Sequence, residues 1–356
     1  MTLGEPVNLS RKRRILYLGD MRYGETSGYR FEALRRLGQE VIPFQITDYD
    51  FKQPFLNKLR AYFASGPWIV SFNKAVLRAA REHKPDVIWM DKPIYITAKT
   101  LGKIKNAGAL TVSFTQDGPF GLRKDKVWRQ YYRTFKLFDL HCLFRSVDVA
   151  RFQQWGLPYV SLMFSYDPAT HFPPPGEWTD SQRNREVSYV GSPLEDRPQF
   201  LRALAEQHNL PLVIDGPHWQ KIFTPELMAR YVSKGQLMGK AYREAIWKSK
   251  INLSFLTQLN EDDIAHKSVE IAACAGFLLT LRCPGHEALF EEDKEAVFFS
   301  SIEECADKIR FYLPRGDLRQ QIGQRARERA LRSGYDNDTQ LIKVLQALDG
   351  KSTSAI

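Results

Sequence analysis

Residues 250–280 read KINLSFLTQLNEDDIAHKSVEIAACAGFLLT, and this stretch decides the expected fold. Its two ends, 250–254 and 277–280, have the short apolar pattern of buried strands. Between them, residues 264–275 repeat apolar side chains at helical spacing, and Gly276 ends that helix. A strand, a helix and a second strand in this order predict a parallel β-α-β unit with both faces of its sheet covered.

The same alternation continues on both sides of this stretch. Further strands are predicted at 14–19, 40–44, 86–90, 110–114, 186–191, 212–216 and 296–299. Helices are predicted at 28–37, 55–83 (one or two), 96–106, 196–208, 239–248, 302–313, 315–333 and 337–348. The chain therefore reads as two successive α/β units of similar size.

A proline-rich segment separates the two units. Residues 171–176 read HFPPPG, and three prolines remove three amide donors, so neither a helix nor a central strand is expected there. We expect a domain at 1–170, a second at 171–336, and a helix and tail at 337–356 that pack back toward the first domain. The predicted fold class is α/β, with two Rossmann-like α/β/α domains facing each other across a cleft that holds the ligand at the strands' carboxyl ends.

The composition favours a soluble globular protein. The 356 residues are 43% hydrophobic and 26% charged, which argues against a disordered chain, a collagen or a coiled coil. No apolar run reaches the roughly 18 residues of a membrane span. Four cysteines at 142, 274, 283 and 305 lack metal-binding spacing, which favours free thiols in the cytoplasm and predicts no metal site.

The positive charge is concentrated in the first half. Residues 1–170 hold 27 Lys and Arg against 15 Asp and Glu, whereas residues 171–356 hold 24 against 26. The first half should therefore prefer an anionic partner, which leaves nucleic acid, an acidic membrane surface and a phosphate-bearing substrate open. Nucleic acid is the weakest of these, because no nucleic-acid-binding motif accompanies the charge.

The first strand–helix loop, residues 19–28, could hold an anion on its backbone amides. Its glycines do not fit the dinucleotide fingerprint, so a dehydrogenase is not expected. A plain flexible turn is the alternative. Candidate acceptor-binding residues are Gly24, Thr26 and Ser27 in this loop and Asp91 at the end of a later strand. Asp117, also after a strand, is a catalytic candidate, although a turn or capping role would explain both aspartates equally well.

The N-terminus of the helix at 264–275 carries the most informative polar group. His266, Lys267 and Ser268 lie near its start, with Glu270 one turn further on. A helix N-terminus beside a lysine suits a diphosphate, and a carboxylate suits the two hydroxyls of a ribose. Together they describe a nucleotide-diphosphate pocket. A capped helix with a solvated charged face is the alternative.

These residues carry a resemblance to a known family. The run from 250 to 313 resembles the C-terminal domain of GT-B glycosyltransferases, in particular the spore-maturation (CgeB-like) branch. The shared features are the helix KSVEIAACAG at 267–276, the strand FLLT at 277–280 and the segment from His286 to Phe299. The wider superfamily has two acidic residues separated by seven, and this chain has Asp262 and Glu270, with aspartate where glutamate is usual.

Weaker similarity extends over nearly the whole chain. Gly191 and Ser192, followed by Arg197, resemble the family's loop near the donor phosphates. Residues 215–219, with Gly216, His218 and Trp219, resemble its turn near the nucleotide base. Residues 28–38 and the turn at 116–118 resemble parts of its first domain.

The resemblance implies transfer of a sugar from a UDP-, GDP- or dTDP-linked donor to a glycan, lipid-linked or protein acceptor, with retention and without a bound metal or other cofactor. It implies that the first domain binds the acceptor and the second the donor. Lys267 and Arg197 would hold the diphosphate, assisted by Ser268, with His266 beside them. Glu270 would hold the ribose and Asp262 the transferred sugar or the acceptor. An epimerase or hydrolase on the same fold, or a non-catalytic nucleotide- or polyanion-binding module, would also fit.

The basic segment at 55–84 interleaves cations with aromatic side chains. This pattern suits an interfacial helix on anionic lipid, which would bring the enzyme to an anionic or lipid-linked acceptor at the inner face of the membrane. A helix packed on the sheet with a solvated charged face is the alternative.

Overall fold

The computed structural model describes residues 11–122, 126–176 and 178–352. Its contacts divide the chain into two compact units. The N-terminal unit contains the described residues up to 163, together with 259–261 and those from 337 onward, and the C-terminal unit contains 164–258 and 262–336. The boundary along the chain therefore falls between residues 163 and 164, upstream of the proline-rich segment. The last helix belongs to the N-terminal unit.

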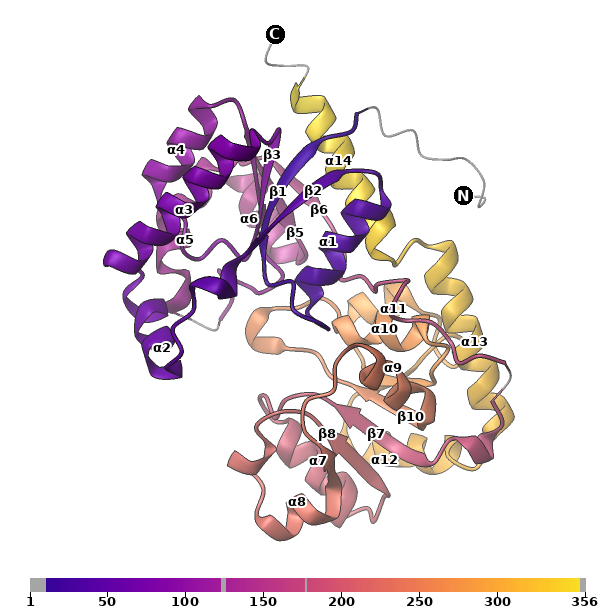
Figure 1. Cartoon of the computed structure of the whole chain (residues 1–356). Helices are drawn as coiled ribbons and strands as arrows, with labels where there is room; N and C mark the ends of the chain where they lie inside the picture. The colour runs from indigo at the N-terminus through magenta and orange to yellow at the C-terminus, as the bar shows by residue number, and fades with distance from the viewer. Residues whose placement is uncertain (1–10, 123–125, 177, 353–356) are drawn as a thin grey trace. The chain divides into compact units, whose positions relative to one another are not determined.

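Within the described residues, each unit is built on a parallel six-stranded sheet (Figure 1). The strand–helix alternation predicts the parallel sheets, but not the strands β5, β6 and β9. In the N-terminal unit the strand order is β2-β1-β3-β4-β5-β6. The strands are β1 (Arg14–Gly19), β2 (Glu40–Gln45), β3 (Val87–Asp91), β4 (Leu110–Phe114), β5 (Leu140–Leu143) and β6 (Tyr159–Ser161). All of their pairings are parallel, so their carboxyl ends form one edge.

Helices cover both faces of this sheet (Figure 1). They are α1 (Thr26–Arg36), α2 (Pro54–Phe63), α3 (Pro67–His83), α4 (Ala98–Asn106), α5 (Arg129–Thr134), α6 (Ser146–Gln154) and α14 (Asn337–Ser352). The last helix packs beside α1, and its Asp338 accepts from Arg36 at 2.6 Å. The predicted helix at 55–83 is two helices, because Ala64 and Gly66 adopt positive φ angles between α2 and α3.

The C-terminal sheet has the order β12-β11-β10-β7-β8-β9. Its strands are β7 (Arg185–Val190), β8 (Leu212–Asp215), β9 (Val232–Lys234), β10 (Ser249–Ser254), β11 (Leu278–Leu281) and β12 (Val297–Phe299). Its helices are α7 (Arg197–Glu206), α8 (Pro225–Tyr231), α9 (Gly239–Lys248), α10 (His266–Ala273), α11 (Pro284–Leu289), α12 (Ile302–Tyr312) and α13 (Gly316–Arg332). The β10-α10-β11 unit has the parallel arrangement predicted from residues 250–280.

Each sheet has its own apolar core. In the C-terminal unit, side chains of β7, β10 and β11 pack against α7 and α12, and this side of the sheet is filled by residues such as Leu201, Leu253 and Ile309. In the N-terminal unit, β1, β3 and β5 pack against α3, α4 and α5. Among the described residues, no helix has both the length and the apolar character that crossing a membrane requires.

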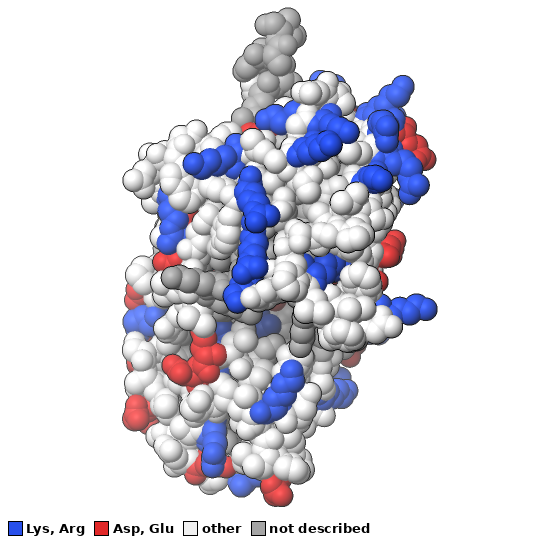
Figure 2. All heavy atoms as spheres, turned by 90° about the vertical axis from the view of Figure 1, so that its left-hand side faces the viewer, with Lys and Arg blue, Asp and Glu red and all other residues white. Residues whose placement is uncertain are grey.

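Figure 2 shows the side of the molecule on which α2, α3 and α4 lie. Lys and Arg side chains spread over the part of this face that belongs to the N-terminal unit, with few Asp or Glu between them. Part of the positive charge counted in the first half of the sequence therefore lies on this face of the N-terminal unit.

Candidate functional site

The candidate site lies where α10 begins, after strand β10. That strand is central, between β7 and β11, so the loop that follows it opens at the carboxyl edge of the sheet. Helix α10 starts after Ala265, and among the described residues no side chain caps it from the N-cap position. An N-terminus without such a cap leaves the positive end of the helix dipole available to an anion.

Glu270 is the best-organised residue of this site. Its side chain is 9% exposed and lies in a ring of polar groups. The hydroxyl of Tyr242 donates to Oε2 at 2.9 Å, while Nε2 of His171 and Nε2 of His266 lie 3.7 and 3.6 Å from Oε1. These partners come from α9, from the proline-rich segment and from the first turn of α10.

The same neighbours keep the Glu270 carboxyl ionised. Burial alone would raise its pKa, but the charges of His266, His171 and Lys267 and the hydrogen bond from Tyr242 together hold that pKa below its usual value. A carboxylate that stays ionised can accept two O–H donors, as the hydroxyls of a ribose would require.

Lys267 and Arg197 bring positive charge to the same region. Burial lowers the pKa of the Lys267 ammonium, Glu270 opposes that shift, and the charge of Arg197 adds to it. The ammonium of Lys267 lies 5.4 Å from the centre of the Tyr242 ring. The positive charges of Lys267 and Arg197 therefore add in this region, which favours an anionic ligand there.

Arg197 is the first residue of α7 and is held by groups from the end of β7 and from the loop after β10. Its guanidinium donates to the hydroxyl of Tyr189 at 3.2 Å, to the carbonyl of Leu256 at 3.1 Å and to Oγ1 of Thr257 at 2.9 Å. Its buried Nε has no partner among the described residues. The side chain is therefore held between the ends of β7 and β10, and its Nε–H can still donate a hydrogen bond to a ligand.

Ser268 faces the core instead of the α10 opening. Its fully buried hydroxyl lies 3.1 Å from Oγ of Ser254 and 3.1 Å from Nε2 of His286. His286 Nε2 also accepts from the amide of Ala265 at 3.0 Å, and Nδ1 lies 2.8 Å from the carbonyl of Leu281. This pattern fixes the tautomer with the proton on Nδ1. His286 therefore holds the start of α10 from the core side, through its contacts with Ala265 and Ser268.

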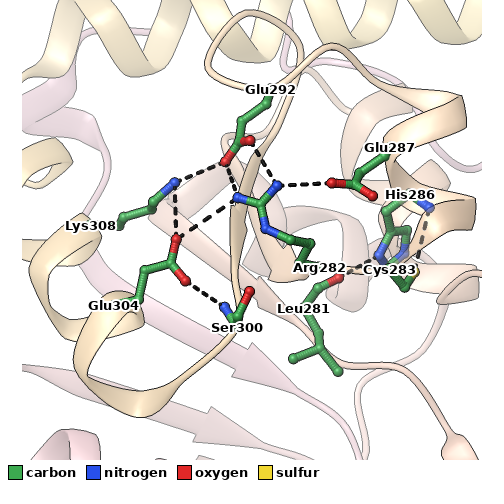
Figure 3. A network of polar contacts seen from close by, with 9 residues as sticks. All are labelled: Leu281, Arg282, Cys283, His286, Glu287, Glu292, Ser300, Glu304 and Lys308. Carbon is green, nitrogen blue, oxygen red and sulfur yellow. Dashed lines mark hydrogen bonds and ion pairs between the residues drawn. The ribbon is translucent and has the colours of Figure 1, made fainter.

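Figure 3 shows His286 beside a network of ion pairs that follows β11. Arg282 donates to Glu292 and Glu287, and Lys308 of α12 reaches Glu292 at 3.0 Å. Three carboxylates, including Glu304, surround the two cations Arg282 and Lys308. Both cations are therefore already paired, and the network ties the segment after β11 to α12.

We expect His286 to make stability depend on pH. Burial lowers its pKa from the ordinary value of 6.5, so below about pH 6.5 the unfolded chain binds a proton that the folded chain does not. The free energy of unfolding should then fall as pH falls, by at most about 1.4 kcal/mol per pH unit for this group. Urea unfolding of the wild type and His286→Gln between about pH 7 and about pH 5 measures the effect; equal pH slopes in the two proteins would contradict it.

The predicted donor loops at β7 and β8 are in direct contact. The amide of Gly191 donates to Asp215 at 2.8 Å, and a Cβ on Gly216 would lie 2.0 Å from the Gly191 carbonyl, so only glycine fits there. The Trp219 ring is fully buried, and its Nε1 donates to the same carbonyl at 2.8 Å, so it supports this loop from the core. His218 is exposed beside it.

Two further predicted site residues, Ser192 and Asp262, make backbone hydrogen bonds. The carbonyl of Ser192 accepts from Tyr189 at 3.1 Å. The amide of Asp262 donates to Thr257 at 3.3 Å, which folds the segment before α10 back on itself and leaves Asp262 partly exposed.

The acceptor candidates belong to the N-terminal unit. Asp91, at the end of β3, accepts from Arg30 at 2.6 and 2.8 Å and from Tyr17 at 2.8 Å, so a buried ion pair engages it. The hydroxyl of Ser27 lies 3.2 Å from that of Tyr17 and is buried in the same cluster.

The remaining acceptor candidates are more accessible. Thr26 donates to Gln116 at 2.9 Å, which joins the first loop to the turn after β4. Gly24 has a φ of 82°, a conformation that favours glycine in this loop. The catalytic candidate Asp117, in the same unit, is half-exposed and pairs with Lys92 at 2.5 Å.

The structure adds site residues that the sequence did not reveal. Tyr242 contacts both Glu270 and Lys267, and His171 contacts Glu270 from within the segment interpreted as a linker. No spacing signal links these residues, because they come from separate elements. Among the described residues, no group of three or more His, Cys, Asp or Glu side chains could hold a metal ion.

Comparisons with known proteins bear on the family and the fold of the chain. Residues 197–346 match the family described as glycosyl transferase-like, and this range includes Arg197, Tyr242, Lys267 and Glu270. A comparison with curated protein sequences finds no match.

Solved structures resemble the whole chain. Sucrose-phosphate synthase from Thermosynechococcus elongatus has a TM-score of 0.66 and 11% identity, over 97% of this chain and 100% of that one. HepE from Anabaena, in complex with UDP-glucose, has a TM-score of 0.59 and 15% identity, over 96% and 100%. A glycosyltransferase from Rickettsia africae has a TM-score of 0.60 and 14% identity, over 94% and 97%. The chain therefore has the two-domain α/β fold of GT-B glycosyltransferases, and over residues 197–346 it matches the glycosyl transferase-like family.

Proposed function

We propose that this protein binds a nucleoside-diphosphate sugar at the N-terminus of α10 and transfers the sugar to an acceptor. The observation that carries the proposal is the arrangement of Glu270, Lys267 and Arg197: a carboxylate held ionised, with two cations nearby, at the uncapped start of a helix. The family match over the same residues and the UDP-glucose in the HepE structure support a donor of this class.

Each group has a distinct task in this proposal. Lys267, Arg197 and the helix dipole offset the charge of the diphosphate as it leaves, while Glu270 accepts hydrogen bonds from the ribose. The bond between the sugar's anomeric carbon and the diphosphate oxygen breaks, and a bond from that carbon to an acceptor oxygen forms. The acceptor proton passes to the leaving diphosphate, so no separate strong base is needed. Asp262 contacts the transferred sugar or the acceptor.

We propose retention of anomeric configuration, catalysis without a metal ion, and an anionic or lipid-linked glycan acceptor. Retention fits a mechanism in which the leaving phosphate takes the proton on the same face as attack. The excess of Lys and Arg in the N-terminal unit fits an anionic acceptor. Nuclear magnetic resonance of the product reports the anomeric configuration, and activity that disappears with a chelator would contradict the metal-free mechanism.

Thermal shifts with UDP, GDP and dTDP, followed by calorimetry, test donor binding. We expect one of the three to stabilise the folded protein, because a ligand that binds only the native state raises its free energy of unfolding. Donor turnover without any acceptor would assign an epimerase or hydrolase activity instead, and binding without turnover of any donor would assign a non-catalytic module.

Tyr242→Phe is expected to weaken nucleoside-diphosphate binding by about 1 kcal/mol, or roughly fivefold. The variant removes the hydroxyl that orients Glu270 and keeps the ring beside Lys267. Calorimetry measures the change. Tyr231→Phe is the matched control, because the buried Tyr231 hydroxyl has no partner among the described residues. Equal affinity in both variants and the wild type would show that Tyr242 does not position the carboxylate.

A further inference from the structure

Helix α2 turns its apolar side outward. Phe55, Leu59, Tyr62 and Phe63 are 60, 47, 41 and 57% exposed. They stand at positions i, i+4, i+7 and i+8, so they form one continuous stripe along the helix. An ordinary surface helix buries such a stripe against its core, and α2 does the reverse. These four residues are called the α2 stripe below.

The other side of α2 is attached by a cation. Arg60 is buried, and its guanidinium lies 4.0 Å from the Trp68 ring centre and 4.7 Å from that of Tyr95. It also donates to Asp50 at 2.6 Å and to the carbonyl of Tyr49 at 2.9 Å. Because these contacts fix the rotation of the helix, the outward direction of the stripe follows from the fold.

The neighbouring helix α3 behaves differently. Its apolar residues Ile69, Phe72 and Val76 are buried against the sheet, so most of the basic segment at 55–84 has the packed arrangement. Within this segment, only α2 remains a candidate for contact with a lipid surface.

Cations border the α2 stripe. The ammonium of Lys126 lies 4.4 Å from the Tyr62 ring centre and donates to its hydroxyl at 3.2 Å. The guanidinium of Arg129 lies 4.7 Å from the same ring and donates to the Tyr62 carbonyl at 3.0 Å. Arg133, one turn further along α5, is exposed. The wider face is also rich in Lys and Arg (Figure 2).

We propose that the α2 stripe and its bordering cations dock on an anionic lipid surface. Aromatic and leucyl side chains enter the region between headgroups and acyl chains, while Lys126, Arg129 and Arg133 meet the lipid phosphates. The charge pattern favours lipid over a second copy of this chain. In a symmetric dimer built on the stripe, these cations would face their own counterparts and repel each other.

This docking goes beyond glycosyl transfer and does not depend on it. Vesicle binding needs no donor, so its failure would leave the donor site intact, and loss of donor binding would leave the α2 stripe intact. If both hold, the protein would meet its acceptor at a membrane surface.

Flotation with vesicles tests the proposal. The full-length protein is mixed with vesicles of phosphatidylcholine alone or of phosphatidylcholine with phosphatidylglycerol, at about 0.05 M and about 0.5 M salt. We expect binding to the anionic vesicles at low salt, little to the neutral ones, and a steep fall at high salt. Phe55→Ser, Leu59→Ser and Phe63→Ser combined should lower binding to the anionic vesicles by about tenfold or more.

A matched triple variant controls for the loss of exposed apolar area. Leu194→Ser, Ile222→Ser and Phe311→Ser change side chains of the C-terminal unit that are 40, 54 and 48% exposed, and binding should not change. A charge variant, Lys126→Glu with Arg133→Glu, should lower binding and its salt dependence. Thermal unfolding confirms that each variant is folded.

Three results would overturn the proposal. The first is no binding to anionic vesicles at low salt by the wild type. The second is equal loss of binding in the α2 triple and the matched triple. The third is a wild-type dimer that the α2 triple converts to a monomer in sedimentation, since the stripe would then serve a second copy of the chain.

Discussion

Asp91→Ala is expected to destabilise the N-terminal unit by about 3–5 kcal/mol, because it leaves the buried Arg30 without its counter-ion. The two side chains are 9 and 3% exposed, and both Nε and Nη2 of Arg30 donate to Oδ2 of Asp91. The Arg30 guanidinium also lies 4.4 Å from the Phe114 ring centre, so the cation cannot turn toward water without disturbing the packing.

Urea unfolding followed by fluorescence measures this loss. Asp307→Ala is a suitable control, because Asp307 is 77% exposed in its pair with Arg310 and such pairs contribute about 0–1 kcal/mol. Pairing Asp91→Leu with Arg30→Met should recover part of the stability by removing both charges. A loss below about 1 kcal/mol in Asp91→Ala would mean that the pair is not buried in solution.

Lys267→Ala and Glu270→Ala are each expected to weaken nucleoside-diphosphate binding by about 1–3 kcal/mol, which is roughly 5- to 150-fold in Kd. Lys267→Ala removes a charge beside the diphosphate, and Glu270→Ala removes the acceptor for the ribose hydroxyls. Glu270→Gln should lie between Glu270→Ala and the wild type, since it keeps one acceptor oxygen.

Calorimetry with the folded variants gives these affinities directly. Lys248→Ala is the matched control on α9, because Lys248 is 43% exposed and only 3.8 Å from Glu244 in a surface pair. Unchanged affinity in both Lys267→Ala and Glu270→Ala would remove the proposed pocket, whatever the control shows.

The sequence predicted the fold well because its strands are short apolar runs separated by glycine and helical stretches. The β10-α10-β11 unit and the two-unit organisation follow from that pattern. It missed β5, β6 and β9, which have only four, three and three residues. It did not decide whether residues 55–83 form one helix or two. The break occurs at Ala64, whose positive φ angle cannot be predicted from an alanine in the sequence.

The candidate site was predictable only along one helix. Lys267 and Glu270 lie within one turn of each other, so their spacing could be read from the sequence. The Tyr242 hydroxyl and the His171 imidazole reach Glu270 from other elements, and only the fold brings them together. Periodicity also does not tell which way a small side chain points, and Ser268 in fact faces His286 in the core.

A crystal structure with a bound nucleoside diphosphate would place the ligand relative to α10 and so test the proposed pocket. We expect diphosphate oxygens within hydrogen-bond distance of Lys267 and Arg197, and ribose hydroxyls on the carboxylate of Glu270. Density for the nucleotide away from α10, or a ribose that does not touch Glu270, would contradict it.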